Sequence, residues 1–251
     1  MSTLLNAWAW ISTVTLVLLG TPVVFAVYCV TTPFDRGRYL TGRLFRLLGV
    51  TSVKLNPLWR FDTAGTFIRD PRRPYVAVSN HESYADIFLI SHLPWEMKWI
   101  SKETMFRIPF FGWMMHMAGD ISITRGERTS TVKAMEAARD RLRKRVSVMI
   151  FPEGTRSRGA DLLPFKDGAF RLALEAGVPI LPIVVAGTRT AMAKGTFRFQ
   201  RARARVRVLD PIDTTGLTVD DVATLRERTR AIIDDARRAL ARELQGERRR
   251  G

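Results

Sequence analysis

The residues best suited to acid–base chemistry form the polar segment SNHESYAD, residues 79–86, which follows a short apolar stretch. Histidine is the side chain best suited to moving a proton in either direction near neutral pH, which makes His81 a candidate acid or base. A carboxylate five residues further on cannot share a helix face with it, so we expect His81 to precede a helix. Asp86 can then reach one imidazole nitrogen and leave the other as a general base.

The same segment also has a purely structural interpretation. Ser83 and Asp86 have the spacing of a capping box, in which both side chains serve only to begin a helix. A histidine followed after five positions by an aspartate is a common chance pattern. From these residues alone, the catalytic and the structural interpretations both stay open.

A second polar segment, PEGTRSR at residues 152–158, follows the apolar run that ends at Phe151. Gly154 permits close approach of the backbone, and neighbouring N–H groups can form an anion-binding nest. Arg156 carries a planar guanidinium that suits phosphate. An ordinary charged surface loop is the alternative interpretation.

Short apolar runs alternate with helical patterns and predict the elements that position these loops. We expect strands at residues 75–78, 97–101, 121–124, 146–151 and 180–185, and helices at about 87–90, 129–144, 168–176 and 218–245. Strands separated by helices predict an α/β fold, with a mixed, mostly parallel sheet flanked by helices. Open sheets of this kind place ligands beyond the carboxyl ends of their strands.

Two further segments have alternative interpretations. Residues 201–208, RARARVRV, predict a strand with a basic face. That face is either the solvated side of an edge strand or a dock for lipid headgroups or a phosphorylated carrier. Residues 109–117, PFFGWMMHM, are either core packing, a flexible wall for an acyl chain, or a membrane-facing helix.

The composition narrows the class of partner. The 251 residues carry a net charge of +16, which indicates nucleic acid, an anionic membrane or a phosphorylated substrate. The single cysteine, Cys29, excludes a disulfide framework and favours a reducing compartment. No histidine–cysteine spacing indicates a metal site, and we expect no metal.

The N-terminal residues 4–30 are almost free of charge and long enough to cross a bilayer core of about 30 Å. Gly20-Thr21-Pro22 interrupts this stretch, so one long helix and a two-helix hairpin both remain open. The first positive charges follow it, which places the globular part on the cytoplasmic side of the inner (plasma) membrane. We therefore divide the chain into a membrane-associated segment, 1–35, and a catalytic domain, 36–251.

Four blocks resemble the glycerolipid acyltransferases, specifically the 1-acylglycerol-3-phosphate (lysophosphatidic acid) acyltransferase branch. The blocks are NHESYAD at 80–86, GDISITR at 119–125, FPEGTRS at 151–157 and VPILP at 178–182. They follow the family's order and spacing between Val76 and Val185, and Lys102 matches a further family position. The resemblance also implies an N-terminal membrane-docking segment, often of two helices.

The resemblance implies that His81 and Asp86 are the catalytic pair, with His81 as the base that activates the acceptor hydroxyl. The acyl donor is then a thioester of coenzyme A or acyl carrier protein, and neither an acyl-enzyme nor a cofactor is needed. The residues implied for binding the lysophospholipid are Glu153, Gly154, Thr155, Arg156, Lys102 and Arg125.

Alternatives remain at this stage. Lys102 and Arg125 can instead be solvated charges, and the acceptor can be another lysolipid. A basic nucleic-acid-binding protein would explain the charge, but not the apolar N-terminus or the four ordered blocks. We therefore expect the bilayer, a lysophospholipid and an acyl thioester as partners, and no nucleic acid.

Overall fold

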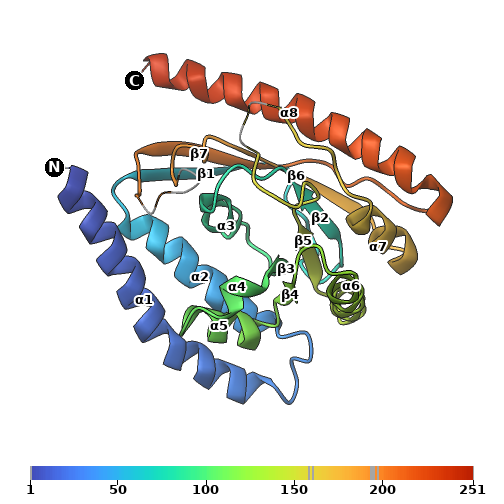
Figure 1. The fold of residues 1–251 in the computed structure, drawn as a ribbon, viewed down its shortest axis with the longest axis horizontal. Helices are drawn as coiled ribbons and strands as arrows, with labels where there is room; N and C mark the ends of the chain where they lie inside the picture. The colour runs from blue at the N-terminus through green and yellow to red at the C-terminus, as the bar shows by residue number, and fades with distance from the viewer. Residues whose placement is uncertain (1, 158, 160, 193–195, 197, 251) are drawn as a thin grey trace.

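The computed structural model describes residues 2–157, 159, 161–192, 196 and 198–250 (Figure 1). Its helices are α1 (Ser2–Thr31), α2 (Tyr39–Leu55), α3 (Ala85–Ile90), α4 (Glu103–Phe106), α5 (Phe111–Ala118), α6 (Arg128–Arg143), α7 (Gly168–Ala176) and α8 (Val222–Arg250), with a 3₁₀ turn η1 (Val219–Asp221) before α8. Its strands are β1 (Trp59–Gly65), β2 (Val76–Ser79), β3 (Met97–Lys102), β4 (Ile121–Ile123), β5 (Ser147–Ile150), β6 (Ile180–Ala186) and β7 (Ala202–Val208).

The seven strands form one sheet in the order β1-β7-β6-β2-β5-β3-β4. The pairing of β6 with β7 is antiparallel, and the other pairings between neighbouring strands are parallel. The predicted mixed, mostly parallel sheet is therefore confirmed. Because β2 to β6 all run in the same direction, their carboxyl ends meet at one edge of the sheet, where the two polar loops begin.

Helices cover both faces of the sheet and create two separate cores. Val76 and Val78 of β2 pack with residues of α6, α7 and α8 on one face. Ala77, which points the other way, packs with Leu89 of α3 on the opposite face. The sheet is thus buried on both sides, and only the loops at its ends are free to carry chemistry.

The helix α1 is a single unbroken helix with Pro22 inside it, so the predicted interruption at Gly20–Pro22 does not break it. The chain instead turns back after Thr31, and α2 lies antiparallel beside α1. A β-carbon at Gly20 would lie 2.4 Å from the Leu48 side chain, so glycine is what lets the two helices approach at this point. The predicted hairpin within residues 4–30 is therefore wrong, and the alternative of one long helix is confirmed; α1 pairs with α2 instead.

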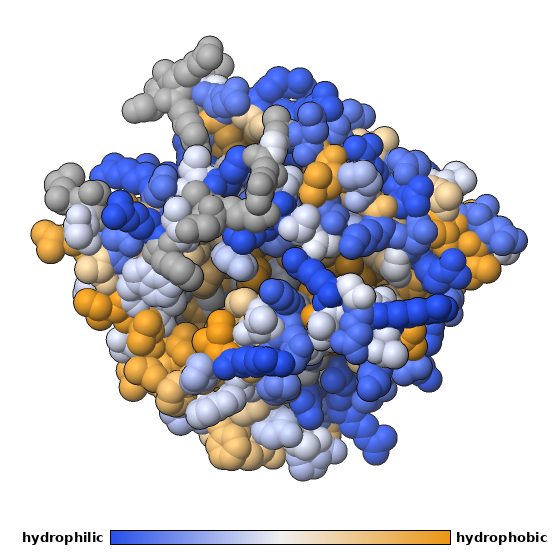
Figure 2. All heavy atoms as spheres, in the orientation of Figure 1, coloured by the Kyte–Doolittle hydropathy of each residue, from blue (hydrophilic) through white to orange (hydrophobic). Residues whose placement is uncertain are grey.

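The outer face of α1 is apolar and uncovered. Among the described residues, α1 is the one helix long and apolar enough to cross a membrane by length and composition. Figure 2 shows apolar atoms gathered along the lower left margin, where α1 runs in Figure 1. The large apolar side chains exposed on α1 are Leu4, Trp8, Ile11, Val14, Leu18, Leu19, Val23, Phe25 and Val30. This surface indicates that the protein associates with a membrane.

The segment at residues 109–117 contributes to the core and to the surface. Met114 and Met115 of α5 are buried against Val24 of α1 and Phe45 of α2. Trp113 points outward and is 53% exposed. Core packing therefore accounts for one side of α5, while its outer side extends the apolar surface next to α1.

A buried ion cluster joins α2 to the sheet. Arg46 of α2 donates to Asp120 and lies 3.6 Å from the Glu96 carboxylate, which also pairs with Lys98 at 3.0 Å. Burial raises the pKa of Glu96 and lowers the pKa of Lys98, and their mutual attraction opposes both shifts. A β-carbon at Gly42 would lie 2.2 Å from the Glu96 carboxylate, so α2 rests directly on this ion pair.

The basic strand β7 is not an edge strand, and its arginines are not free to dock a ligand. It lies between β1 and β6. Arg205 pairs with Glu247 at 3.0 Å and Arg207 with Glu243 at 2.6 Å, both on α8. The interpretation as an edge strand is therefore wrong. The interpretation as a docking face is not supported either, because two glutamates of α8 pair with these arginines.

Candidate active site

The loop at residues 80–86, called the catalytic loop for the predicted role of His81, leaves the sheet at the carboxyl end of β2. The Asn80 side chain donates to the Val185 carbonyl at 2.9 Å and accepts from the Val185 N–H at 2.9 Å. The amide thereby pairs with β6 as a further strand residue would. These two hydrogen bonds fix the point at which the chain leaves the sheet, one residue before His81.

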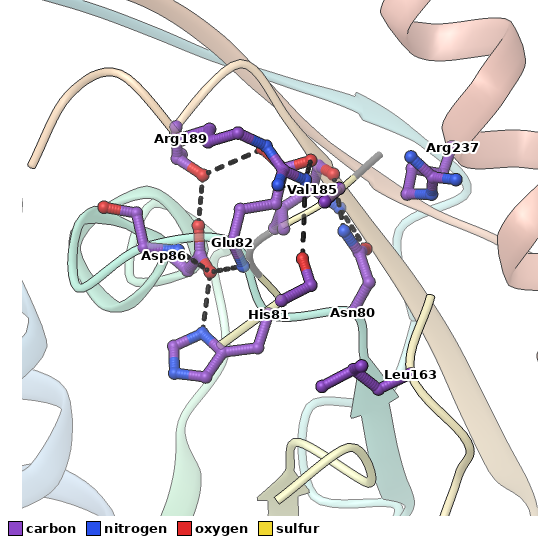
Figure 3. A network of polar contacts seen from close by, with 12 residues as sticks. Asn80, His81, Glu82, Asp86, Leu163, Val185, Arg189 and Arg237 are labelled. Atoms are coloured by element: carbon purple, nitrogen blue, oxygen red, sulfur yellow. Dashed lines mark hydrogen bonds and ion pairs between the residues drawn. The ribbon is translucent and has the colours of Figure 1, made fainter. Parts of the chain in front are cut away.

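His81 and Asp86 lie in direct contact, as the sequence predicted. The Nδ1 atom of His81 is 2.8 Å from Oδ2 of Asp86 (Figure 3). The same oxygen accepts the N–H groups of Glu82 at 2.7 Å and Ser83 at 2.9 Å. An ionised carboxylate can only accept, so Nδ1 carries the hydrogen and Nε2 keeps a free lone pair. Such an imidazole is poised to take a proton at Nε2.

Asp86 also serves the capping function that was the structural alternative. It accepts the Ser83 N–H just before α3, so one carboxylate both begins the helix and orients the imidazole. The Ser83 hydroxyl is buried and donates to the Met192 carbonyl at 3.0 Å. Cys29, the other conceivable nucleophile, is on the exposed side of α1. Neither residue is placed to attack beside His81.

The second loop, residues 151–157, packs against the catalytic loop. The Phe151 ring stacks on the His81 imidazole with centroids 3.9 Å apart. The N–H of Ser157 donates to the His81 carbonyl at 2.9 Å. The side chain of His81 is 10% exposed. The two loops thus form one wall around the imidazole, which is largely buried.

Glu153 stabilises this wall through hydrogen bonds to the backbone of His81 and Leu163. Its carboxylate accepts the N–H of His81 at 2.8 Å and the N–H of Leu163 at 3.0 Å. Burial raises the pKa of Glu153, while the two backbone donors and His81 oppose that shift. Both oxygens are therefore engaged by the backbone, whereas the family resemblance implied a contact with the acceptor.

Gly154 differs from its predicted role in a similar way. Its N–H donates to the Phe151 carbonyl at 3.0 Å and closes a turn, so it is not directed at a bound anion. Gly154 has φ of +69°, a conformation that favours glycine. The residue is needed for the turn itself. Thr155 follows it and is half-buried.

We expect Glu153→Gln to lower kcat by about tenfold to a hundredfold and to lower Tm, because an amide NH₂ would face a backbone N–H at one of its two contacts. Steady-state kinetics and thermal unfolding measure both effects. The control is Glu175→Gln, at an exposed position on α7 where the carboxylate pairs with Arg139. Wild-type kcat in Glu153→Gln would contradict this role.

Three predicted binding residues are basic and lie near the same edge of the sheet. The Arg156 guanidinium lies 3.8 Å from the ring centroid of Tyr84, a cation–π contact between the two loops. Lys102 is the last residue of β3, and Arg125 follows β4 after one residue. Both are exposed, and β3 and β4 are parallel to β2 and β5, so these positions belong to the edge that carries His81.

Residues after β6 complete the site and were not predicted from the sequence. Thr188 donates to the second oxygen of Asp86, and Arg189 lies 3.5 Å from Glu82. Arg189 also donates to the Ser157 hydroxyl at 3.4 Å, which ties the third loop to the second. The position of these residues could have indicated a role in the site, because residues 187–189 also follow the carboxyl end of a strand.

Comparison with known proteins indicates an acyltransferase. The family model described as Acyltransferase matches residues 62–186. The chain is 37% identical over 197 residues to human 1-acyl-sn-glycerol-3-phosphate acyltransferase alpha, covering 78% of this chain and 70% of the human protein. It therefore belongs to the 1-acyl-sn-glycerol-3-phosphate acyltransferase family.

A yeast relative and a solved structure agree with this assignment. The 1-acyl-sn-glycerol-3-phosphate acyltransferase of Saccharomyces cerevisiae is 34% identical over 163 residues, covering 63% of this chain and 54% of the yeast protein. The crystal structure of the 1-acyl-sn-glycerophosphate acyltransferase PlsC from Thermotoga maritima superposes with a TM-score of 0.78, at 25% identity, over 95% of each chain. The whole architecture, including α1, is thus similar to that of a family member.

Proposed function

We propose that this protein transfers a fatty acyl group from a thioester to the free hydroxyl of 1-acylglycerol-3-phosphate, giving phosphatidic acid. The observation that carries the proposal is the 2.8 Å contact between Nδ1 of His81 and Asp86, which leaves Nε2 as a base. Family membership supports the choice of substrates. The donor is a thioester of coenzyme A or of acyl carrier protein, and no cofactor takes part.

In the proposed reaction, Nε2 of His81 removes the proton from the acceptor hydroxyl as its oxygen attacks the thioester carbonyl. Asp86 stabilises the imidazolium that forms. The tetrahedral intermediate then collapses, the carbon–sulfur bond breaks, and the imidazolium returns its proton to the leaving thiolate. General base catalysis contributes about 10²–10⁴-fold, and positioning of the substrates supplies a further share.

The acceptor phosphate is proposed to bind at Arg156, with Lys102 and Arg125 as further cations on the same edge. The Tyr84 ring holds the Arg156 guanidinium by a cation–π contact at 3.8 Å, and the guanidinium N–H groups are proposed to bind the phosphate oxygens. A cation held this way loses little conformational freedom when the ligand arrives.

Arg156→Ala should raise the KM for the acceptor by about tenfold to a hundredfold, because a hydrogen bond to a charged group is lost. The KM for the thioester donor should stay within about twofold, since the donor carbonyl does not contact Arg156 in this scheme. Initial rates with each substrate varied in turn test this. Arg139→Ala, on α6, where the guanidinium pairs with Glu175 of α7, is the control. An unchanged acceptor KM in Arg156→Ala would remove Arg156 from the phosphate site.

The membrane-associated segment, residues 1–35, is proposed to lie in one leaflet together with α2. Polar contacts tie α1 to the catalytic domain from its first turn, where Asn6 donates to the Phe199 carbonyl, to its last, where Thr31 contacts Thr41. A helix fastened along its whole length cannot cross a bilayer without carrying α2 into the hydrocarbon. We propose that the catalytic domain, 36–251, faces the cytoplasm at the inner (plasma) membrane.

The double substitution Leu19→Glu and Val23→Glu should lower partitioning into vesicles at least tenfold. These side chains are 67% and 53% exposed on α1, and burial of each in lipid is worth about 1.5–3 kcal/mol. Flotation with liposomes measures the bound fraction. Val132→Glu, at an apolar position on α6 that is 50% exposed, is the control, and equal binding of both variants would place the docking surface elsewhere.

The proposed function is tested by presenting the purified protein with a panel of lysolipids and both kinds of acyl thioester, with products identified by mass spectrometry. We expect acyl transfer to 1-acylglycerol-3-phosphate to exceed transfer to lysolipids that lack a phosphomonoester. Preferred acylation of another lysolipid would overturn the choice of acceptor. Salt-dependent binding to DNA or RNA without acyl transfer would favour the nucleic-acid alternative, which the pairing of Arg205 and Arg207 with α8 argues against.

A further inference from the structure

The side of Asp86 that faces away from His81 is held by a residue from a distant part of the chain. The hydroxyl of Thr188 donates to Oδ1 of Asp86. Both residues are fully buried. Oδ2 already accepts from His81 and from two backbone N–H groups, so Thr188 supplies the donor for the remaining oxygen. The carboxylate is thus fixed on both sides.

The backbone before Thr188 is built to deliver this hydroxyl. β6 ends at Ala186, and Gly187 has φ of +91°. A β-carbon at Gly187 would lie 2.3 Å from the Arg203 carbonyl oxygen, so no other residue fits without displacing β7. The N–H of Ala191 donates to the Thr188 carbonyl at 2.9 Å and closes the turn. These constraints aim the Thr188 side chain back under the catalytic loop.

A second carboxylate shares the same hydroxyl. Oε2 of Glu82 lies 3.4 Å from the Thr188 oxygen. Burial and the nearby Asp86 carboxylate raise the pKa of Glu82, while Arg189 and Arg237 act in the opposite direction. Figure 3 shows the imidazole at one end of this network and Arg189 at the other. A hydroxyl has one proton to donate, and the short contact with Asp86 shows which carboxylate receives it.

We infer that Thr188 is a positioning residue for the acyl transfer, which holds the Asp86 carboxylate so that the proton stays on Nδ1 of His81 and Nε2 remains the base. The inference rests on the proposed function for its kinetic consequences. Its structural content is the tautomer of His81, which is measurable without turnover.

Without the Thr188 donor, Oδ1 of Asp86 would be a buried anionic oxygen with one partner fewer. The carboxylate would then attract the positive imidazolium more strongly and would be held at Oδ2 alone. A larger share of His81 would be protonated at a given pH. The base would be lost at pH values where the wild-type protein still has it, so the acid limb of activity would move to higher pH.

The test compares Thr188→Val, Thr188→Ser and a matched control, Thr229→Val. Thr229 is equally buried, and its hydroxyl donates to the Leu225 carbonyl within α8, so this control reports the cost of removing a buried hydroxyl away from the site. For Thr188→Val we expect kcat to fall about tenfold to a hundredfold, KM values to stay within about twofold, and the acid limb to shift upward. Thr188→Ser should recover kcat to within about threefold of wild type.

Nuclear magnetic resonance of ¹⁵N-labelled histidine supplies the readout that needs no substrate. We expect His81 of the wild type to carry its hydrogen on Nδ1 and Thr188→Val to show a mixture of tautomers or a raised midpoint of titration. Wild-type kinetics and tautomer in Thr188→Val would overturn the inference. So would a loss of kcat with unchanged pH dependence and no recovery in Thr188→Ser. If the wild type acylates no lysophospholipid, the proposed function fails, while the histidine spectra still decide the role of Thr188.

Discussion

His81→Ala should lower kcat by about 10²–10⁴-fold while the protein remains folded and bound to membranes. The imidazole supplies the only base in contact with Asp86 among the described residues, since Nδ1 faces that carboxylate and Nε2 remains open. Its backbone contacts to Glu153 and Ser157 survive the substitution because they involve main-chain atoms. The turnover number at saturating substrates, measured with a mass-spectrometric assay, tests this expectation.

His116→Ala is the matched control, because its imidazole packs edge-on against Phe106, among the helices next to α1. This variant should retain turnover within about threefold of wild type. Far-ultraviolet circular dichroism and liposome flotation should give the same result for both variants. Turnover above about one tenth of wild type in His81→Ala would remove the imidazole from the role of base.

Arg46→Met should destabilise the protein by about 3–5 kcal/mol, because it removes one partner from a buried ion cluster, leaves Asp120 without its cation and leaves Glu96 with Lys98 alone. Methionine replaces most of the side-chain volume, so lost packing contributes little. The free energy of unfolding in urea, measured in detergent, gives the magnitude.

Arg43→Met, on the same helix, separates the two causes. Arg43 donates to the Leu93 carbonyl at 2.7 Å and is half-buried. It therefore loses a hydrogen bond without stranding a buried carboxylate, and we expect a cost of about 0.5–1.5 kcal/mol. Equal costs in Arg43→Met and Arg46→Met would show that the cluster adds nothing to stability.

The sequence predicted the local parts of the structure well because local patterns determine them. The helix at residues 168–176 begins and ends as predicted, after Asp167 and before Gly177. The contact between His81 and Asp86 was predictable because five residues of chain separate them. Both depend on interactions within a short stretch, where spacing alone limits the geometry.

The features that the sequence did not predict depend on partners far along the chain. Alternation in residues 201–208 gave the two faces of β7 correctly, but it carries no information on which strands lie beside it. The signal for its true environment was on α8, where Glu243 and Glu247 are four residues apart and therefore share a face. The strand β1, Trp59–Gly65, alternates in a similar way and was missed.

The helix α2 was missed for a related reason. Phe45, Leu44 and Leu48 pack with α1 and α5. Arg43 and Arg46 make buried or half-buried contacts instead of forming a solvated face, so neither a continuous apolar run nor a solvated polar face marks this helix. Thr188 was missed because its partner, Asp86, is 102 residues away. In both cases a contact with a distant part of the chain gives the residues their structural role. Their residue types and local spacing do not indicate that contact.

The ion cluster beneath α2 has a consequence for how a lipid would be recognised. Lys98 lies on β3 four residues before Lys102, and Asp120 directly precedes β4, whose end leads to Arg125. The buried ion cluster therefore connects the helix pair that we propose to lie in the membrane with the strand ends that carry these cations. Once docked, the protein would hold that basic rim at a set elevation over the leaflet, so a headgroup is selected by how far it projects as much as by its charge.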